Sequence, residues 1–319
     1  MRIAEALDGV VMQHCRRTGE GRYQPLTPGP ETEHVIVLRD ARALKAVRPH
    51  FPKARFHVWL HDQVARGSTR ARWLQTADPL LSGCTLICVS DFLRRNVEPV
   101  VRGLSSGSEI ALRVIYNPVG DDLAPNGAGI DPDKLLFMSS PNKGLDYTLT
   151  AFQAIRRNIG GLKLYVANPG YRQVPRVALP GVEWLGTLAP AQVVEQARSA
   201  LCVFMPNFLL PETFGLVFAE ANAVGTPVLA HDCGAAREVL HDSNPVLAVR
   251  TRQRQFALLM RGLAWRGRRF AASAGLRLGV FDDYIELLSH WRAGQRPRVD
   301  VSNAFRQNAV VREWQALLR

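Results

Sequence analysis

One continuous stretch, residues 200–230, limits the fold more than any other part of this 319-residue chain. It begins with the apolar run Ala200–Met205, which has the length and composition of a buried parallel strand. A short loop follows, and residues 212–215 then lead into a helix with an apolar face. Residues 225–227, Gly-Thr-Pro, end that helix, and a second strand starts at Val228. The stretch therefore predicts a strand–helix–strand unit of a parallel α/β sheet.

The start of this helix has the features of a phosphate site. A helix N-terminus with a glycine, here Gly215, presents unpaired backbone N–H groups at the carboxyl end of a parallel strand. Two carboxylates flank it, Glu212 and Glu220, and eight steps of roughly 1.5 Å span about 12 Å at most. That span suits a sugar, a diphosphate and a ribose in a row. The alternative is that both glutamates only stabilise an exposed helix start.

The motif resembles that of a known enzyme family. The residues Pro211-Glu212, Glu220-Ala221 and 225–228, Gly-Thr-Pro-Val, together resemble the E-x7-E signature of retaining GT-B glycosyltransferases of the group 1, family 4 type. That family uses nucleotide-sugar donors. The resemblance implies an α/β protein with the GT-B fold: two Rossmann-like, doubly wound domains facing a cleft, with a C-terminal helix that crosses back to the first domain.

The resemblance assigns roles around the motif. Glu212 would act in catalysis and contact the donor sugar together with Thr213 and Phe214. The N–H groups of Gly215 and Leu216 would hold the diphosphate. Glu220 would bind the ribose.

Two further segments resemble donor-site segments of the family. The run 139–146, Ser-Ser-Pro-Asn-Lys-Gly-Leu-Asp, is similar to a basic loop in which Lys143 would pair with the diphosphate and assist catalysis. The family often has an arginine just upstream, where this chain has Ser139 and Ser140; either these serines or Arg172 would replace it. Gly186 and Thr187, at the end of the predicted strand 182–187, would lie by the nucleotide base.

The first half of the chain contains short apolar strands that alternate with helices, as in a doubly wound domain. Residues just past such strands line the ligand crevice, which makes His61, Asp62 and Ser90 site candidates. His61 resembles the family's catalytic cleft histidine, and Asp62 and Ser90 would lie on the acceptor side. Ser90 could instead only cap the next helix. The family's first Gly-Gly loop has only a poor counterpart in 19–21, Gly-Glu-Gly.

These patterns divide the chain into four parts. Residues 1–119 form an acceptor-side Rossmann-like domain, shortened within 1–34, and the turn-rich segment 120–131 is a linker. Residues 132–300 form the nucleotide-sugar-binding domain. Residues 301–319 form the helix that packs back on the first domain.

Composition excludes several classes of protein. No apolar run reaches the length of a membrane span and the start lacks the apolar core of a signal peptide, so we expect a cytoplasmic protein, peripheral at the inner face of the plasma membrane. The five cysteines lack metal-site spacing and read as free thiols. We expect no metal and no cofactor, the nucleotide sugar being a substrate.

The net charge of +12 indicates an anionic partner. The segment 250–277 is rich in arginine and has no acidic residue. Aromatic platforms and modules typical of nucleic-acid binding are missing, so no nucleic-acid partner is expected. An anionic membrane surface fits better. A merely solvated basic face is the alternative.

We therefore predict a retaining hexosyltransferase that moves a sugar from a nucleotide-diphosphate sugar to a hydroxyl of a glycan or glycolipid. Cell-envelope polysaccharide or lipopolysaccharide biosynthesis is the expected setting. Two alternatives remain open: a non-catalytic GT-B-fold binding or scaffold protein, motivated by the poor first loop, and a GT-B-fold nucleotide-sugar epimerase.

Overall fold

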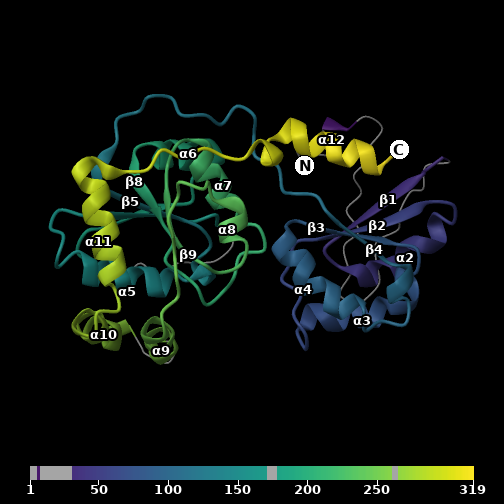
Figure 1. Cartoon of the computed structure of the whole chain (residues 1–319), viewed down its shortest axis with the longest axis horizontal. Helices are drawn as coiled ribbons and strands as arrows, with labels where there is room; N and C mark the ends of the chain where they lie inside the picture. The colour runs from purple at the N-terminus through teal and green to yellow at the C-terminus, as the bar shows by residue number, and fades with distance from the viewer. Residues whose placement is uncertain (1–5, 8–30, 171–177, 261–264) are drawn as a thin grey trace. The chain divides into compact units, whose positions relative to one another are not determined.

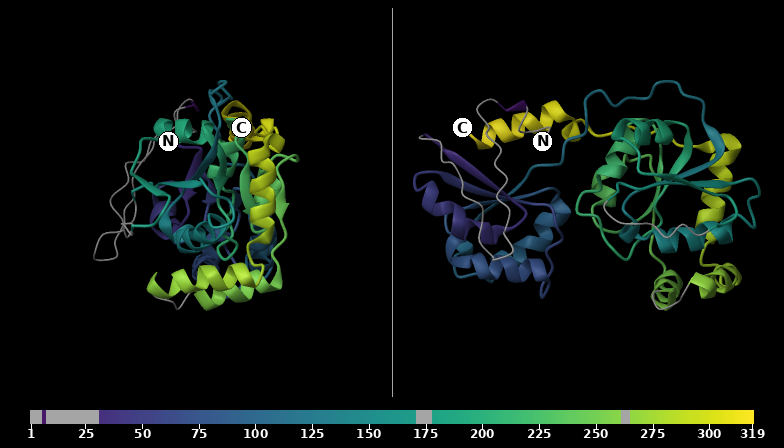
Figure 2. Two further views of the ribbon diagram at one scale, coloured as in Figure 1. Left: turned by 90° about the vertical axis from the view of Figure 1, so that its left-hand side faces the viewer. Right: turned by 180° about the vertical axis from the view of Figure 1, so that it is seen from behind.

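The structure is a computed structural model that describes residues 6–7, 31–170, 178–260 and 265–319. The chain divides into two compact units. Unit 1 comprises the described part of Met1–Gly120 together with Asn303–Arg319, and unit 2 comprises Asp121–Ser302. Figures 1 and 2 show the elements of each unit.

Unit 1 is built on a four-stranded sheet in the order β1-β2-β3-β4, and every neighbouring pair is parallel. The strands are β1 (His34–Leu38), β2 (Arg55–Leu60), β3 (Thr85–Cys88) and β4 (Ala111–Val114). The helices that connect them are α2 (Leu44–Val47), α3 (Thr69–Leu81) and α4 (Asp91–Val101). Parallel strands need such crossovers because each chain must return to the same end of the sheet.

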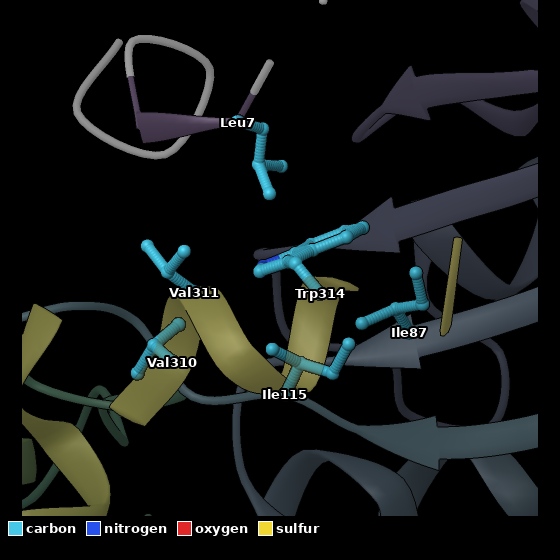
Figure 3. Close-up of a cluster of buried hydrophobic side chains, with 6 residues drawn as sticks. All are labelled: Leu7, Ile87, Ile115, Val310, Val311 and Trp314. Carbon is cyan, nitrogen blue, oxygen red and sulfur yellow. The ribbon is translucent and has the colours of Figure 1, made fainter. Parts of the chain in front are cut away.

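The C-terminal helix α12 (Gln307–Leu317) covers the sheet face opposite α3 and α4 (Figures 1 and 2). Its Trp314 is fully buried and meets Trp59 of β2 with ring centroids 4.8 Å apart. Figure 3 shows Trp314 in a cluster with side chains from β3 and the segment after β4; the cluster is Leu7, Ile87, Ile115, Val310, Val311 and Trp314. The predicted packing of the last helix on the first domain is confirmed.

Unit 2 contains a six-stranded sheet in the order β10-β9-β8-β5-β6-β7, again parallel throughout. The strands are β5 (Asp131–Met138), β6 (Lys163–Ala167), β7 (Val182–Gly186), β8 (Ala200–Phe204), β9 (Val228–His231) and β10 (Val246–Leu247). This is the strand order of Rossmann folds. The first and fourth strands of the unit, β5 and β8, are parallel neighbours, so the strand order reverses between them and a ligand crevice is expected there.

Helices lie on both faces of this sheet. In Figure 1, α6 and α7 lie on one side, and α5 and α10 on the other. The helices are α5 (Leu145–Ile155), α6 (Pro190–Arg198), α7 (Leu216–Ala223), α8 (Ala236–Val239), α9 (Thr251–Met260), α10 (Trp265–Arg277) and α11 (Asp282–His290). None of the helices among the described residues is long and apolar enough to cross a membrane.

The predicted elements of both units form, with differences at their ends. Helix α3 was not expected from the sequence, because Pro79 near its end and the arginines along it obscure the helical periodicity. The sequence predicts a helix over residues 41–47 after β1, and the structure has this segment as a 3-10 turn at Ala41–Ala43 followed by α2. The helix predicted to follow residues 212–215 begins at Leu216, and Glu212 precedes it in a loop, as expected.

Candidate functional site

The central contact of unit 2 joins the loops that follow β5 and β8. Lys143 Nζ donates to Glu212 Oε2 at 2.9 Å, although the two residues are 69 positions apart in the chain. The lysine side chain is 33% exposed and the glutamate side chain 17%, so the pair is open to solvent on one side. The structure thus brings together two of the sequence-predicted residues at the switch point of the sheet.

The loop after β5 holds Lys143 by its backbone. Ser140 is the N-cap of a 3-10 turn, Pro141–Lys143, and its carbonyl accepts from the Lys143 N–H at 2.8 Å. Gly144 follows with φ of 90°, and a Cβ on it would lie 2.6 Å from the Cβ of Asn207, in the loop after β8. A glycine is required here because the left-handed conformation and the close neighbour both exclude a side chain.

The loop that follows β9 holds the backbone of Glu212 in place. Glu212 forms a parallel bridge with Gly234, and the Ala235 N–H donates to the Glu212 carbonyl at 2.9 Å. A Cβ on Gly234, whose φ is 71°, would lie 2.4 Å from that carbonyl oxygen. The position of the Glu212 side chain therefore depends on a glycine that follows β9.

The helix start beside this pair keeps donor groups for an anion. Gly215 is the N-cap of α7, with φ of 87°, and the first N–H groups of the helix that follows it have no acceptor within the helix because no turn precedes them. Leu216 is 41% exposed, whereas Phe214 is 1% exposed and belongs to the core. A donor-sugar contact from Phe214 would therefore come from its backbone. Glu220 lies within α7 and is half-buried.

The other predicted donor-side residues lie at neighbouring strand ends. Ser139 and Ser140 are half-buried after β5, and the Ser140 hydroxyl donates to Asn142 Oδ1 at 2.5 Å. Gly186 ends β7 with φ of 71°, and Thr187 after it is exposed. Thr213 is half-buried between Glu212 and Phe214. Arg172 and residues 19–21 lie outside the described residues.

In unit 1, His61 and Asp62 follow β2. Burial, with a smaller contribution from Arg39, lowers the pKa of His61 to about 4, so the imidazole is neutral at pH 7. Its ring contacts Trp59 at 4.6 Å between centroids. Ser90 is fully buried, and its hydroxyl accepts from the Leu93 N–H at 2.9 Å as the cap of α4. Ser90 therefore caps α4, which is the alternative that the sequence left open for it.

A buried polar chain behind the donor loops was not predicted from the sequence. His231 Nε2 and the Tyr284 hydroxyl are 2.6 Å apart, and the Tyr284 and Tyr147 hydroxyls are 3.1 Å apart. His231 Nδ1 lies 3.2 Å from the Leu247 carbonyl, so Nδ1 carries the proton and Nε2 accepts from Tyr284. Tyr147 stands in the first turn of α5, directly after the Lys143 loop. The one feature of the sequence that could have indicated this chain of hydrogen bonds is His231, a histidine at the end of the strand β9.

No group of three or more potential metal ligands occurs among the residues that the structure describes.

Comparison with known proteins finds a family match in the second half of the chain. The family "Glycosyl transferases group 1" matches residues 132–264. The phosphatidyl-myo-inositol mannosyltransferase of Mycobacterium leprae is 29% identical over 181 residues, which cover 50% of this chain and 48% of that protein. The D-inositol 3-phosphate glycosyltransferase of Rhodococcus erythropolis is 30% identical over 137 residues, covering 37% and 30%. The match spans about half the length of the mannosyltransferase and less than a third of the inositol phosphate glycosyltransferase.

Solved structures match both units. The GtfA/B complex matches 89% of this chain and 56% of the solved chain with a TM-score of 0.58 and 15% identity. Anabaena Alr3699/HepE in complex with UDP-glucose matches 89% and 78%, with a TM-score of 0.57 and 18% identity. These likenesses establish the predicted GT-B fold. Residues 132–264 of this chain match the glycosyl transferases group 1 family, within a chain that has the GT-B fold.

Proposed function

We propose that this protein transfers a sugar, with retention, from a nucleotide-diphosphate sugar to a hydroxyl of a glycan or glycolipid. The observation that carries the proposal is the 2.9 Å contact of Lys143 with Glu212, beside the N-terminus of α7 and at the switch point of the unit 2 sheet. A cation, a carboxylate and unpaired N–H groups at one edge form a site for a sugar diphosphate. The group 1 match over residues 132–264 supports the same conclusion.

In this proposal the donor replaces the Lys143–Glu212 contact. The lysine and the Gly215 and Leu216 N–H groups bind the diphosphate and stabilise its charge as it leaves. Glu212, released from the lysine, accepts hydroxyls of the donor sugar. Glu220 binds the ribose, and Gly186 and Thr187 lie by the base.

No side chain of the donor site is assigned as a nucleophile. The acceptor hydroxyl would attack the face from which the diphosphate leaves, and a diphosphate oxygen would take its proton. His61, Asp62 and Ser90 are proposed as acceptor-side residues of unit 1. A kinetically competent glycosyl–enzyme adduct, trapped by mass spectrometry, would contradict this mechanism.

The test is calorimetric titration of the protein with UDP, GDP, ADP and TDP. Because Anabaena Alr3699/HepE was solved with UDP-glucose, UDP is the first to try. We expect one diphosphate to bind and both Lys143→Ala and Glu220→Ala to weaken it about 10- to 100-fold, since each removes charge-assisted hydrogen bonds of about 1.5–3 kcal/mol. Lys163→Ala, an exposed lysine of the same unit, is the control.

The alternatives make different predictions. If no diphosphate binds, the scaffold interpretation becomes the leading one. If a nucleotide sugar is converted without any acceptor, the epimerase interpretation is supported. Release of free diphosphate that requires an acceptor supports the transferase.

We further propose that the segment 250–277 contacts an anionic membrane surface, as envelope polysaccharide or lipopolysaccharide synthesis at the inner face would require. On α9, Leu258 is 57% exposed and Leu259 is 74% exposed, one turn beyond the exposed Arg254. Exposed leucines beside arginine suit an anionic interface. Binding to phosphatidylglycerol vesicles that survives Leu259→Glu would argue against this contact.

A further inference from the structure

Two arginines share one carboxylate at the strand ends of unit 1. Arg39 follows β1, and its Nε and Nη2 donate to Asp62 at 3.1 and 2.5 Å. Arg70, in the first turn of α3, places Nη2 3.0 Å from Asp62 Oδ2, the oxygen that also accepts from Arg39 Nε. Because β1 and β2 are adjacent and parallel, Arg39 and Asp62 meet at the carboxyl edge of the sheet, where ligands of such sheets bind.

A tryptophan forms one wall of this cluster. The guanidinium carbons of Arg70 and Arg42 each lie 3.8 Å from the Trp73 ring centroid. Arg42 also donates from Nε and Nη2 to Asp40 at 2.9 and 2.7 Å. The ring and the two carboxylates thus hold three guanidinium groups in fixed orientations. Arg39, Asp62, Arg70 and Trp73 line a cavity of about 10 Å³, the room of one water molecule.

Arg39 occupies an unusual backbone conformation. Its φ of 70° is the only positive value of a non-glycine residue among the described residues. The left-handed region costs an L-residue about 1–2 kcal/mol, and such strain is concentrated at functional sites. The Arg39 N–H donates to the Trp59 carbonyl at 2.8 Å, which ties the residue to β2. The fold therefore maintains a strained position that carries a guanidinium group to Asp62.

The cluster carries a net positive charge. Its charged side chains are three arginines, 39, 42 and 70, and two aspartates, 40 and 62, a sum of +1. The adjacent His61 adds no charge, because its pKa of about 4 keeps it neutral at pH 7. Although burial opposes it, the hydrogen bond and charge of Arg39, with the charge of Arg70, hold the pKa of Asp62 below its ordinary value. Asp62 is thus an ionised anchor for two arginines.

The exposed side of the cluster suits an anion. The Arg39 side chain is 54% exposed, and its two bonds to Asp62 use only part of the N–H donors of a guanidinium. Arginine binds phosphate oxygens through paired N–H groups, and an arginine that is already oriented loses less entropy on binding. A sugar hydroxyl without charge would gain less from this surplus of guanidinium groups.

We propose that Arg39 and Arg70 bind a phosphate group of the acceptor, with Asp62 as the positioning residue that orients both guanidinium groups. That the bound molecule is the acceptor rests on the proposed glycosyl transfer, whereas the binding of a phosphate ester to these arginines does not depend on it. The substrate class is an acceptor that carries a phosphate monoester or diester, either soluble or as a lipid headgroup.

The experiment is a calorimetric titration with glycerol 1-phosphate and with glycerol, made in the Lys143→Ala variant so that the donor-side cation does not contribute. We expect saturable binding of the phosphate ester and none of glycerol. Arg39→Ala and Arg70→Ala should each weaken binding at least 10-fold. Arg102→Ala, which removes a 77% exposed arginine paired with Glu98 on α4, should leave it unchanged.

Two additional variants guard against misfolding effects. Arg39→Lys keeps the charge but removes the paired N–H geometry, and we expect it to bind at least 5-fold more weakly while circular dichroism stays that of the parent. Trp73→Phe should retain binding but abolish the part of the tryptophan emission change that the ester causes, since Trp73 contacts Arg70.

Vesicles distinguish the source of the phosphate. Binding to phosphatidylglycerol vesicles that Arg39→Ala weakens, without binding of the soluble ester, assigns a lipid headgroup; the reverse assigns a soluble phosphorylated acceptor. The proposal is overturned if neither probe binds, or if Arg39→Ala and Arg102→Ala behave alike. The nucleotide titrations fail or succeed separately, so loss of the donor proposal would not be mistaken for loss of this one.

Discussion

Gly234 offers the sharpest test of how the fold positions the donor-side glutamate. In Gly234→Ala the new Cβ would start 2.4 Å from the Glu212 carbonyl oxygen and 2.6 Å from the Glu212 nitrogen. Ordinary contact begins at 3.4 Å, so the two backbones must separate by about 1 Å (3.4 minus 2.4). Both partners are backbone atoms, which cannot rotate away as a side chain can. The displacement is therefore passed on to Glu212.

The expected cost has two parts. Alanine at a φ of 71° costs about 1 kcal/mol. Separation of the two backbones also breaks the 2.9 Å hydrogen bond from the Ala235 N–H to the Glu212 carbonyl, for about 0.5–1.5 kcal/mol more. We expect a total of about 2 kcal/mol in the free energy of unfolding, and about a 100-fold loss of turnover, since a 1 Å misplacement can cost that much.

Gly127→Ala is the matched control. Gly127 belongs to the same unit and has a φ of 76°, but a Cβ on it would meet no atom within 4 Å. It should therefore lose about 1 kcal/mol or less and keep its turnover. Urea unfolding and a coupled assay of diphosphate release measure both quantities. If the two variants lose the same stability and Gly234→Ala keeps its activity, the argument that Gly234 fixes Glu212 is refuted.

Two further predictions concern stability. Trp314→Ala should lower the free energy of unfolding of unit 1 by about 3–5 kcal/mol, because it empties a fully buried site between α12 and the sheet; the exposed neighbour Glu313→Ala should change urea unfolding little. Burial lowers the pKa of His231 to about 4, so the neutral form stabilises the fold fully above about pH 6.5 and this contribution is lost as the pH falls toward 4. Between pH 7 and pH 5 the free energy of unfolding should fall by about 2 kcal/mol through this histidine. His231→Gln should abolish this pH dependence, whereas His290→Gln, at an exposed histidine, should keep it. Identical pH profiles of the two variants in urea unfolding would contradict the assignment.

The donor side shows how far sequence patterns reach. The run 200–230 determines a strand, a loop, a helix and a second strand by local rules, namely apolar length, a glycine at the helix start and a Gly-Thr-Pro stop. These rules act between neighbours in the chain, so they hold without knowledge of the rest of the fold. The resemblance of Glu212, Glu220 and Lys143 to a family motif is also a property of the sequence alone.

Contacts between segments that are distant in the sequence were decided only by the tertiary structure. Lys143 meets Glu212 because the crossover after β7 returns the chain beside β5, a choice that no local pattern encodes. Arg39 and Arg70 were not candidates from the sequence, because arginine is common on surfaces and neither residue stands in a motif. Their shared partner Asp62 lies on another strand end, so the pairing of β1 with β2 creates the cluster. Local chemistry selected the elements, and long-range packing selected which of their side chains meet.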